Sequence, residues 1–247
     1  MKFFNTIRRK LLYDGKITRY LSYAVGEIIL VVIGILIALQ INNWNNEKNS
    51  RAFELKMLNE IDKALTQDHR FFTDHLINIR NKAEFRAIAF FDRAIRTKTI
   101  NKDSIDYHFN RLDHRLRVTT NRGPYDALKS SGLDKISNDS LRNQLIYFYD
   151  FILPRYQGLI QSKLDESSDK MAPLIEMLSK PSPVVITDKG IIRSDLSLKE
   201  IDFEKNEEFN RLLFLTTERA ALVKEVLEAT TPYMSDLSKL INEEIEK

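Results

Sequence analysis

The chain of 247 residues contains no cysteine. This absence excludes a disulfide framework, a thiol nucleophile and a thiolate metal site. No Walker loop, GxGxxG or GxSxG sequence occurs, and the carboxylates are spread along charged helical faces. The histidines form neither an i, i+4 pair nor an HExxH sequence. We therefore predict no metal site, no cofactor and no catalytic residue, and we expect that the protein is not an enzyme.

A basic excess is also missing from most of the chain. The formal net charge is +3, but residues 1–20 contain six basic residues and one acid. Removing these from the totals of 38 basic and 35 acidic residues leaves 32 and 34. The remainder has no positive charge to attract a phosphate backbone, so we expect no nucleic-acid partner.

Residues 21–44 contain a long apolar run. Between Leu21 and Ile41 only Glu27 and Gln40 are strongly polar, and as a helix this run would span roughly 31 Å, the thickness of a bilayer core. Aromatic residues suited to the membrane interface flank it, and they are Tyr20, Tyr23 and Trp44. We predict a transmembrane helix over 21–44. A buried core helix or a cleaved signal peptide is disfavoured by the cationic flank and by the length of the run.

Positive charge lies mainly before this run. The positive-inside rule therefore places residues 1–20 in the cytoplasm and residues 45–247 on the other side of the membrane. Within residues 3–12, Phe3, Phe4, Ile7 and Leu11 fall on one helical face. This pattern suits a short amphipathic helix lying on an anionic inner leaflet, and a frayed tail is the alternative.

Glu27 shares a helical stripe with two small residues, Gly34 and Ala38, which lie within about 20° of it. A small-xxx-small pair lets two helices approach closely in lipid. Glu27 would then face a partner helix, from either a second copy or another membrane protein. Alternatively, Glu27 lies near the headgroups beside Tyr23, where its carboxylate reaches water.

The sequence after residue 44 is predicted to be mainly helical. Glycine and proline are absent between Ile35 and Arg122, which favours a helix that continues beyond the membrane to about residue 97. Short helices are predicted near 103–115 and over 124–131, and a long helix over 204–246. A further long helix over 139–179 would be capped by Asn138 or Asp139 and kinked at Pro154. Residues 181–203 fit either a small hairpin or a plain loop.

Each long helix carries an apolar stripe at three- and four-residue spacing. The first stripe contains Leu58, Ile61, Leu65, Phe72, Leu76, Ile79, Ala83, Ala87, Phe90 and Ala94. The second contains Leu141, Leu145, Phe148, Ile152, Tyr156 and Leu159. The third contains Phe209, Leu213, Thr216, Ala220, Val223, Leu227, Thr230, Met234, Leu237 and Ile241. Such stripes predict helices that pack nearly parallel along their length, either within one chain or between chains.

We therefore predict an all-α fold: the transmembrane helix continues into an extended antiparallel bundle of three long and two short helices over 45–247. If the first helix runs away from the membrane, the helix over 139–179 returns and the last runs outward. Residues 98–138 would then lie at the far tip and residues 181–203 near the membrane. Four arginines, Arg111, Arg115, Arg117 and Arg122, would gather at that tip, where they could bind an anion or a partner or form ordinary salt bridges.

The sequence GEIILVVIGILIALQINNWN (26–45), the preceding KFFNTIRRKLL, and PYDALKSSGLDKISNDSLRNQLIYFYD (124–150) carry a family resemblance. This chain resembles uncharacterised single-pass membrane proteins of Bacteroidetes that contain a domain of unknown function. The resemblance implies a Gram-negative inner-membrane protein with a periplasmic helical domain, and it implies no activity.

Two functions fit these features. The first is an inner-membrane-anchored periplasmic bundle that binds a partner or ligand without catalysis, of which a sensor is a narrower form. The alternative is a structural accessory subunit of an envelope complex for secretion, transport or adhesion. The expected partners are the lipid bilayer and, through the transmembrane helix, a second copy or another membrane protein.

Replacing Glu27 by leucine separates the two explanations of this residue. If Glu27 contacts a partner helix, Glu27→Leu weakens association between transmembrane helices, because an interhelical hydrogen bond in lipid contributes about 1 kcal/mol. In-membrane energy transfer between labelled chains measures that association. Undiminished association would remove the packing role and leave the headgroup explanation.

Overall fold

The computed structural model describes residues 17–113, 118–181, 184–188, 190–193 and 195–247. The chain forms two compact units, Met1–Leu55 and Lys56–Lys247. The helix α2 (Ile17–Arg70) begins in the first unit and ends in the second. The predicted amphipathic helix over 3–12 lies outside the described residues.

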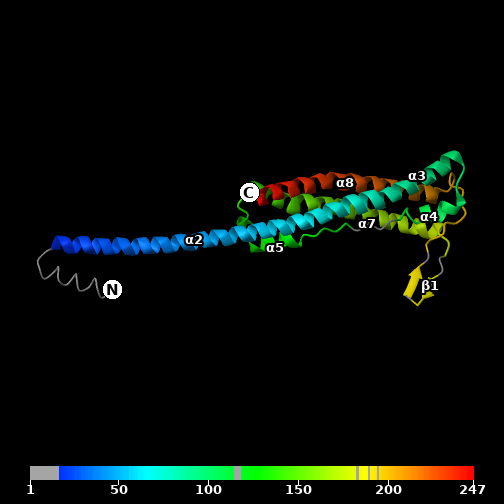
Figure 1. Ribbon diagram of the computed structural model, residues 1–247. Coiled ribbons are helices and arrows are strands. Elements are labelled where there is room, and N and C mark those ends of the chain that lie inside the picture. Colours follow the sequence, from blue (N-terminus) through cyan, green and yellow to red (C-terminus); the bar gives the residue numbers. More distant parts are fainter. Residues whose placement is uncertain (1–16, 114–117, 182–183, 189, 194) are drawn as a thin grey trace. The chain divides into compact units, whose positions relative to one another are not determined.

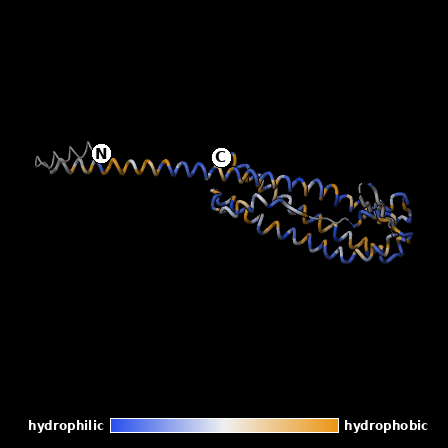
Figure 2. Tube along the Cα trace, turned by 90° about the horizontal axis from the view of Figure 1, so that it is seen from below, coloured by the Kyte–Doolittle hydropathy of each residue, from blue (hydrophilic) through white to orange (hydrophobic). Residues whose placement is uncertain are grey.

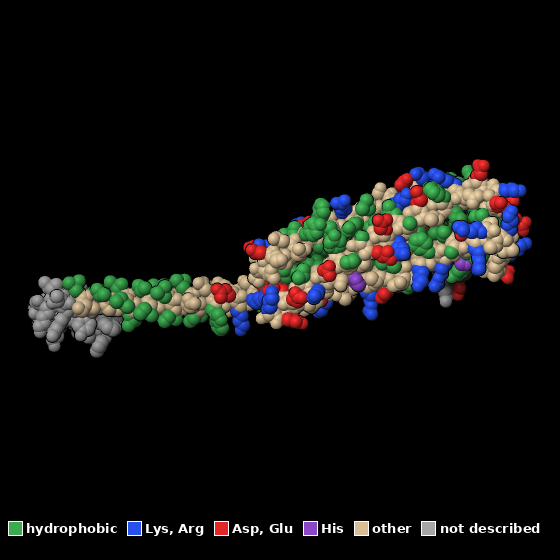
Figure 3. All heavy atoms as spheres, turned by 90° about the horizontal axis from the view of Figure 1, so that it is seen from above, with side chains coloured by type: hydrophobic (Ala, Val, Ile, Leu, Met, Phe, Trp, Pro, Cys, Tyr) green, Lys and Arg blue, Asp and Glu red, His purple; other side chains and the backbone are tan. Residues whose placement is uncertain are grey.

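The described residues of the first unit belong to α2 and include its apolar part. Among the described residues, one helix is long and apolar enough to cross a membrane, and it is this helix near the N-terminus. None of its most apolar window is buried, and Leu30, for example, is 72% exposed. Figure 2 shows this part of α2 mostly in the orange of hydrophobic residues. In Figure 3 hydrophobic side chains line it, whereas charged side chains are dense on the bundle.

The second unit is a bundle of three long helical stretches. The first comprises the end of α2, the π-helical segment η1 (Phe71–Asn81) and α3 (Lys82–Thr97). The second comprises α6 (Asp139–Ile146), the π-helical segment η4 (Tyr147–Ile152) and α7 (Leu153–Leu178), and the third is α8 (Glu207–Ile245). The all-α prediction is confirmed.

Shorter elements connect the long helices. They are the 3₁₀ turns η2 (Lys102–Ser104) and η3 (Leu133–Lys135), and the helices α4 (Ile105–Phe109) and α5 (Gly123–Ser131). Residues 181–203 do contain a hairpin, whose strands are β1 (Val184–Thr187) and β2 (Gly190–Arg193). The predicted short helix over 103–115 was too long, since α4 ends at Phe109 and the chain turns at Asn110.

The predicted order of helix directions was wrong. The ends of α3 and α7 both pack against the start of α8, in one core cluster that contains Phe91, Met171 and Phe209. At the opposite end, the Asn138 side chain before α6 donates to Glu244 near the end of α8. The stretches 56–97 and 139–178 are therefore parallel, and α8 is antiparallel to both (Figure 1).

This arrangement relocates both long connections. The described residues between 181 and 203 lie at the end of the bundle where α3 and α7 stop, which we call the far end, and not at the end that contains Lys56. Because two successive long helices point the same way, the connection between them must travel back along the bundle. The described residues 110–113 follow α4 and residues 118–122 precede α5, near opposite ends of the bundle (Figure 1), and we call these residues the return segment.

Polar side chains attach the return segment to the helices on either side. The Asp68 carboxylate of α2 accepts a hydrogen bond from the backbone N–H of Asn121 at 2.8 Å. The side-chain amide of Gln157 in α7 donates to the Thr120 hydroxyl at 3.1 Å. Asp68 occupies the gap in the predicted apolar stripe between Leu65 and Phe72, so the gap marks a contact with this segment.

Local signals set the helix ends where the sequence predicts them. The Asn138 side chain accepts hydrogen bonds from the Ser140 and Leu141 amides, which would otherwise lack partners at the start of α6. Pro124 lies in the first turn of α5, where its missing N–H costs nothing. Gly132 follows α5 with φ of 108°, a value that residues with a Cβ rarely adopt.

The predicted stripes fail at two positions, and both failures follow from π-helical segments. Ile79 is 57% exposed, whereas Asn81 is 4% exposed. Leu159 is 47% exposed, whereas its neighbour Ile160 is 2% exposed. The i→i+5 hydrogen bonds of η1 and η4 change the number of residues per turn, so a stripe extrapolated at the α-helical period leaves the core face. Pro154, the site of the predicted kink, is the second residue of α7, which begins directly after η4.

Alanine substitutions at two adjacent positions test the register after η4. Ile160→Ala should lower the free energy of unfolding by about 2–4 kcal/mol, because it removes buried methyl groups. Leu159→Ala should change it by less than about 0.5 kcal/mol, because that side chain is exposed. Denaturant unfolding of the two variants measures both values. A larger loss at Leu159 would restore the uninterrupted α-helical register.

Candidate functional site

The four predicted arginines do not share one described patch. The Arg111 guanidinium lies 3.3 Å from the Tyr107 ring centroid and donates to the Tyr107 carbonyl at 2.7 Å, at the end of α4. Arg122 lies before α5, at the opposite end of the bundle (Figure 1). Arg115 and Arg117 lie outside the described residues. Binding of an anion by these residues stays a prediction.

Arg122 belongs to a polar cluster that fastens α5 to η4. It donates to the Tyr149 carbonyl at 2.8 Å and pairs with Asp150 at 3.3 Å. Asp150 also accepts hydrogen bonds from the Tyr125 hydroxyl at 2.8 Å and from Lys129 at 2.7 Å. Burial opposes ionisation of Asp150, but the bonds from Lys129 and Tyr125 and the nearby cations outweigh it and lower its pKa. The polar groups of this cluster bond to one another and connect α5 to η4, which indicates a structural role for the cluster.

The residues of the predicted membrane segment lie along α2. Trp44 is exposed, with the Lys48 ammonium 5.9 Å from its ring centroid. Ala38 is exposed and Glu27 is half-buried. A Cβ built on Gly34 meets no heavy atom within 4 Å, so this stripe is uncovered there in the described part of the chain. The side chains of Tyr20 and Tyr23 are outside the described set.

A buried ion pair joins α3 to α8. The Arg219 side chain is 3% exposed and donates to the Glu84 carboxylate and, at 2.6 Å, to the Leu112 carbonyl of the return segment. Asp113 lies 3.7 Å from the same guanidinium, and Thr216 donates to the Leu112 carbonyl at 3.3 Å. Burial raises the pKa of Glu84, and Arg219 opposes that rise. The sequence did not indicate this pair, because nothing near Arg219 in the sequence shows which residue it contacts.

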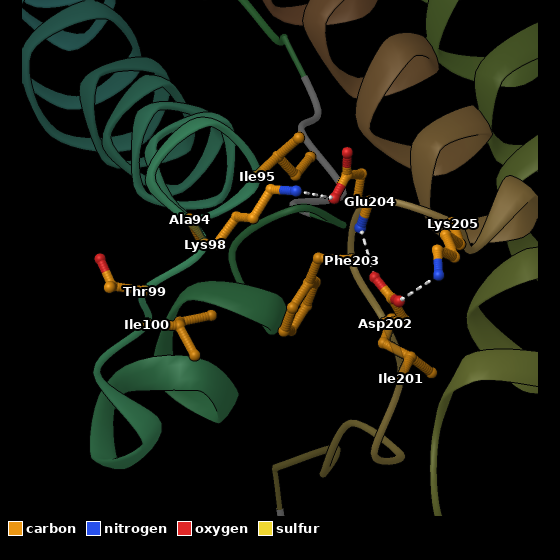
Figure 4. Close-up of a pocket in the computed structure, with 10 residues that line it drawn as sticks. All are labelled: Ala94, Ile95, Lys98, Thr99, Ile100, Ile201, Asp202, Phe203, Glu204 and Lys205. Atoms are coloured by element: carbon orange, nitrogen blue, oxygen red, sulfur yellow. Dashed lines mark hydrogen bonds and ion pairs between the residues drawn. The ribbon is translucent and has the colours of Figure 1, made fainter.

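The candidate ligand site is a pair of adjoining hollows at the far end of the bundle. The larger, of about 530 Å³, lies between the end of α3 and the segment before α8 (Figure 4). A second hollow of about 460 Å³ shares three apolar residues with it, namely Ile100, Ile201 and Phe203. Both volumes fall in the range of small-molecule sites. Neither hollow is lined by Glu84 or Arg219, so the buried ion pair is not part of this site.

Charged side chains form the rim of these hollows. Figure 4 shows the Lys98 ammonium meeting the Glu204 carboxylate, 3.0 Å away, and Lys205 facing Asp202 at 3.8 Å. Three further lysines line the second hollow, and they are Lys102, Lys180 and Lys199. The sequence did not indicate these residues, because they come from separate segments that meet only where α3 and α7 end and α8 begins.

The comparison with known families gives one result. Residues 27–213 match the model of a family of unknown function, DUF6090. The chain belongs to this family. No curated protein and no solved structure matches it. The DUF6090 match begins inside the apolar part of α2 and includes all residues that line the two hollows, so both features lie within the family region.

Substitutions in the buried ion pair test whether it is structural. Glu84→Ala should lower the free energy of unfolding by about 3–5 kcal/mol, because it leaves Arg219 buried without its carboxylate. Combining Glu84→Leu with Arg219→Met should cost less than Glu84→Ala alone, because the double variant leaves no buried charge. Denaturant unfolding measures both. A double variant that is less stable than Glu84→Ala would mean that the pair contributes net stability beyond charge compensation.

Proposed function

We propose that this DUF6090 protein is a single-pass membrane protein whose helical bundle binds a partner or ligand without catalysing a reaction. The observation that carries the proposal is the exposure of the apolar side chains of α2. A stretch of this length with no buried residue would aggregate in water, whereas lipid tails would solvate it. The bundle, in contrast, has its own closed core.

The orientation in the membrane follows from charge. Six cations within residues 1–20 favour a cytoplasmic N-terminus, and a bundle on the periplasmic side of a bacterial inner membrane. The resemblance to single-pass proteins of Bacteroidetes supports the same location. A cleaved signal sequence is the competing explanation of the apolar run, and the length of the cationic flank argues against it.

The binding role is supported by the far end of the bundle. There the hollows combine an apolar floor with a charged rim, the usual composition of a ligand or partner site. A sensor would be stabilised by its ligand, whereas an accessory subunit would co-purify with one partner in a fixed ratio. Signals or assembly contacts could reach a partner through the helix face of Gly34 and Ala38.

Labelling of introduced cysteines tests the anchoring and its direction, and the chain suits this because it has no native cysteine. In cells with a permeable outer membrane, Lys239→Cys should react with a membrane-impermeant maleimide. Lys10→Cys should react only after the inner membrane is disrupted. Equal reaction of both thiols in intact cells, or reaction of Lys10→Cys alone, would contradict the proposed topology.

Charge substitutions test the anchor itself. Ile33→Arg combined with Ile37→Arg should move the protein from the membrane fraction to the soluble fraction, since each arginine costs about 3 kcal/mol at the centre of a bilayer. The matched control is Ile79→Arg combined with Phe214→Arg, two bundle residues of similar exposure, and it should stay with the membrane. A wild-type chain that alkaline carbonate releases would refute membrane anchoring.

A further inference from the structure

The helix from α2 to α3 changes its geometry at η1, in a segment without a helix breaker. Residues 71–81 contain neither glycine nor proline, which are the usual causes of an irregular turn. At the start of η1, the Thr73 hydroxyl donates back to the His69 carbonyl at 3.0 Å, a local bond that loosens the helical ladder. The remaining cause of the π geometry must lie in how the segment packs.

In η1 and α3, two polar side chains are buried while an apolar one is exposed, which is the reverse of the usual preference. One of the two isoleucines of η1, Ile79, faces solvent, while the polar Asn81 and Glu84 are buried. Burial of Asn81 depends on the hydrogen bond from its side-chain amide to the Ala220 carbonyl of α8, at 3.0 Å. Burial of Glu84 depends on Arg219. Two polar contacts to α8 thus hold the helix in this register.

The same helix carries a second, entirely apolar face. At regular α-helical spacing from Phe72 and Leu76, the next core positions are Ile79, Ala83, Ala87, Phe90 and Ala94. Ala87 and Ala94 are buried in the observed register as well, so the two faces overlap at α3. The two registers differ in whether polar side chains, led by Asn81, or apolar ones, led by Ile79, face α8.

Residues before η1 also make polar contacts in the observed register. Asp62 accepts hydrogen bonds from Ser238 and, at 3.2 Å, from Asn242 of α8, and Asp68 holds the return segment. Open space lies beside the segment, in a hollow of about 360 Å³ lined by residues that include Asn78, Asn81 and Phe85. A side chain larger than that of Asn81 could therefore turn toward α8 beside this hollow without displacing α8.

We propose that η1 is a conformational switch, in which residues 71–81 exchange the polar face of the helix for its apolar face by passing from π- to α-helical geometry. The exchange turns α3 and the helical residues before Phe71 relative to one another about the helix axis. A ligand that prefers one register would bias the turn. This inference stands whether or not α2 spans a membrane.

The test measures the accessibility of one thiol in the full-length chain. In the variant Ile79→Cys, the sole cysteine should react with a maleimide at the rate of an exposed thiol. Adding Asn81→Asp places a carboxylate against the Ala220 carbonyl, which penalises the polar face. The thiol should then react at least about tenfold more slowly while the helical content is unchanged, because position 79 has moved into the core (1.4 kcal/mol per factor of ten).

The matched control is Asn78→Asp in the Ile79→Cys chain. It adds the same charge at an exposed residue of the same segment, so the rate should stay within about twofold of the parent. An unchanged rate in the folded Asn81→Asp chain would overturn the proposal. Loss of helical content in that chain would overturn it too, since it would mean that no second register exists.

Discussion

The Arg219 guanidinium is the group on which the packing of the bundle depends. From α8 it contacts the Glu84 carboxylate of α3, the Leu112 carbonyl of the return segment and, at 3.5 Å, the Met171 sulfur of α7. A buried charge needs compensation, so these contacts stabilise the observed register of α3 and α7 against α8. The same contacts place α8 beside both other long stretches, and the contacts at the two ends of the bundle show that it is antiparallel to them.

Two parallel helical stretches impose the rest of the architecture. A chain that ends α3 at the far end must return before α6 can begin, so residues 98–138 cannot form a short loop. The return segment supplies Leu112 to the core. It also brings the ends of α3 and α7 and the start of α8 together, and the two hollows arise where these ends leave the surface incompletely filled.

The sequence predicts well the features that depend on neighbouring residues. Asn138 caps α6, Pro124 lies in the first turn of α5, and the stripe of α8 is buried almost throughout, with Leu213 only partly so. The direction of the second long stretch was missed because a long connection can either turn back at once or travel the length of the bundle. Either path of the connection buries the same apolar stripes of the long helices, so the stripes do not show which path the chain takes.

Features that depend on distant residues were also missed. The exposure of Ile79 and Leu159 follows from the π-helical segments η1 and η4, within which no glycine or proline marks the change in the sequence. The partners of Arg219 and the lysines around the hollows come from segments far apart in the sequence. Such residues could be found only after the order of the helices was known, since no local spacing distinguishes them from ordinary surface charges.

The shared direction of the stretches 56–97 and 139–178 can be tested by a distance measurement. Spin labels can be placed on cysteines introduced at exposed positions of a chain that has none. A label at position 93 should be close to one at position 177 and far from one at position 140. The two distances should differ by roughly 50 Å, the length of a helix over residues 140–177. A short distance from position 93 to position 140 and a long one to position 177 would show instead that the second stretch runs back along the first.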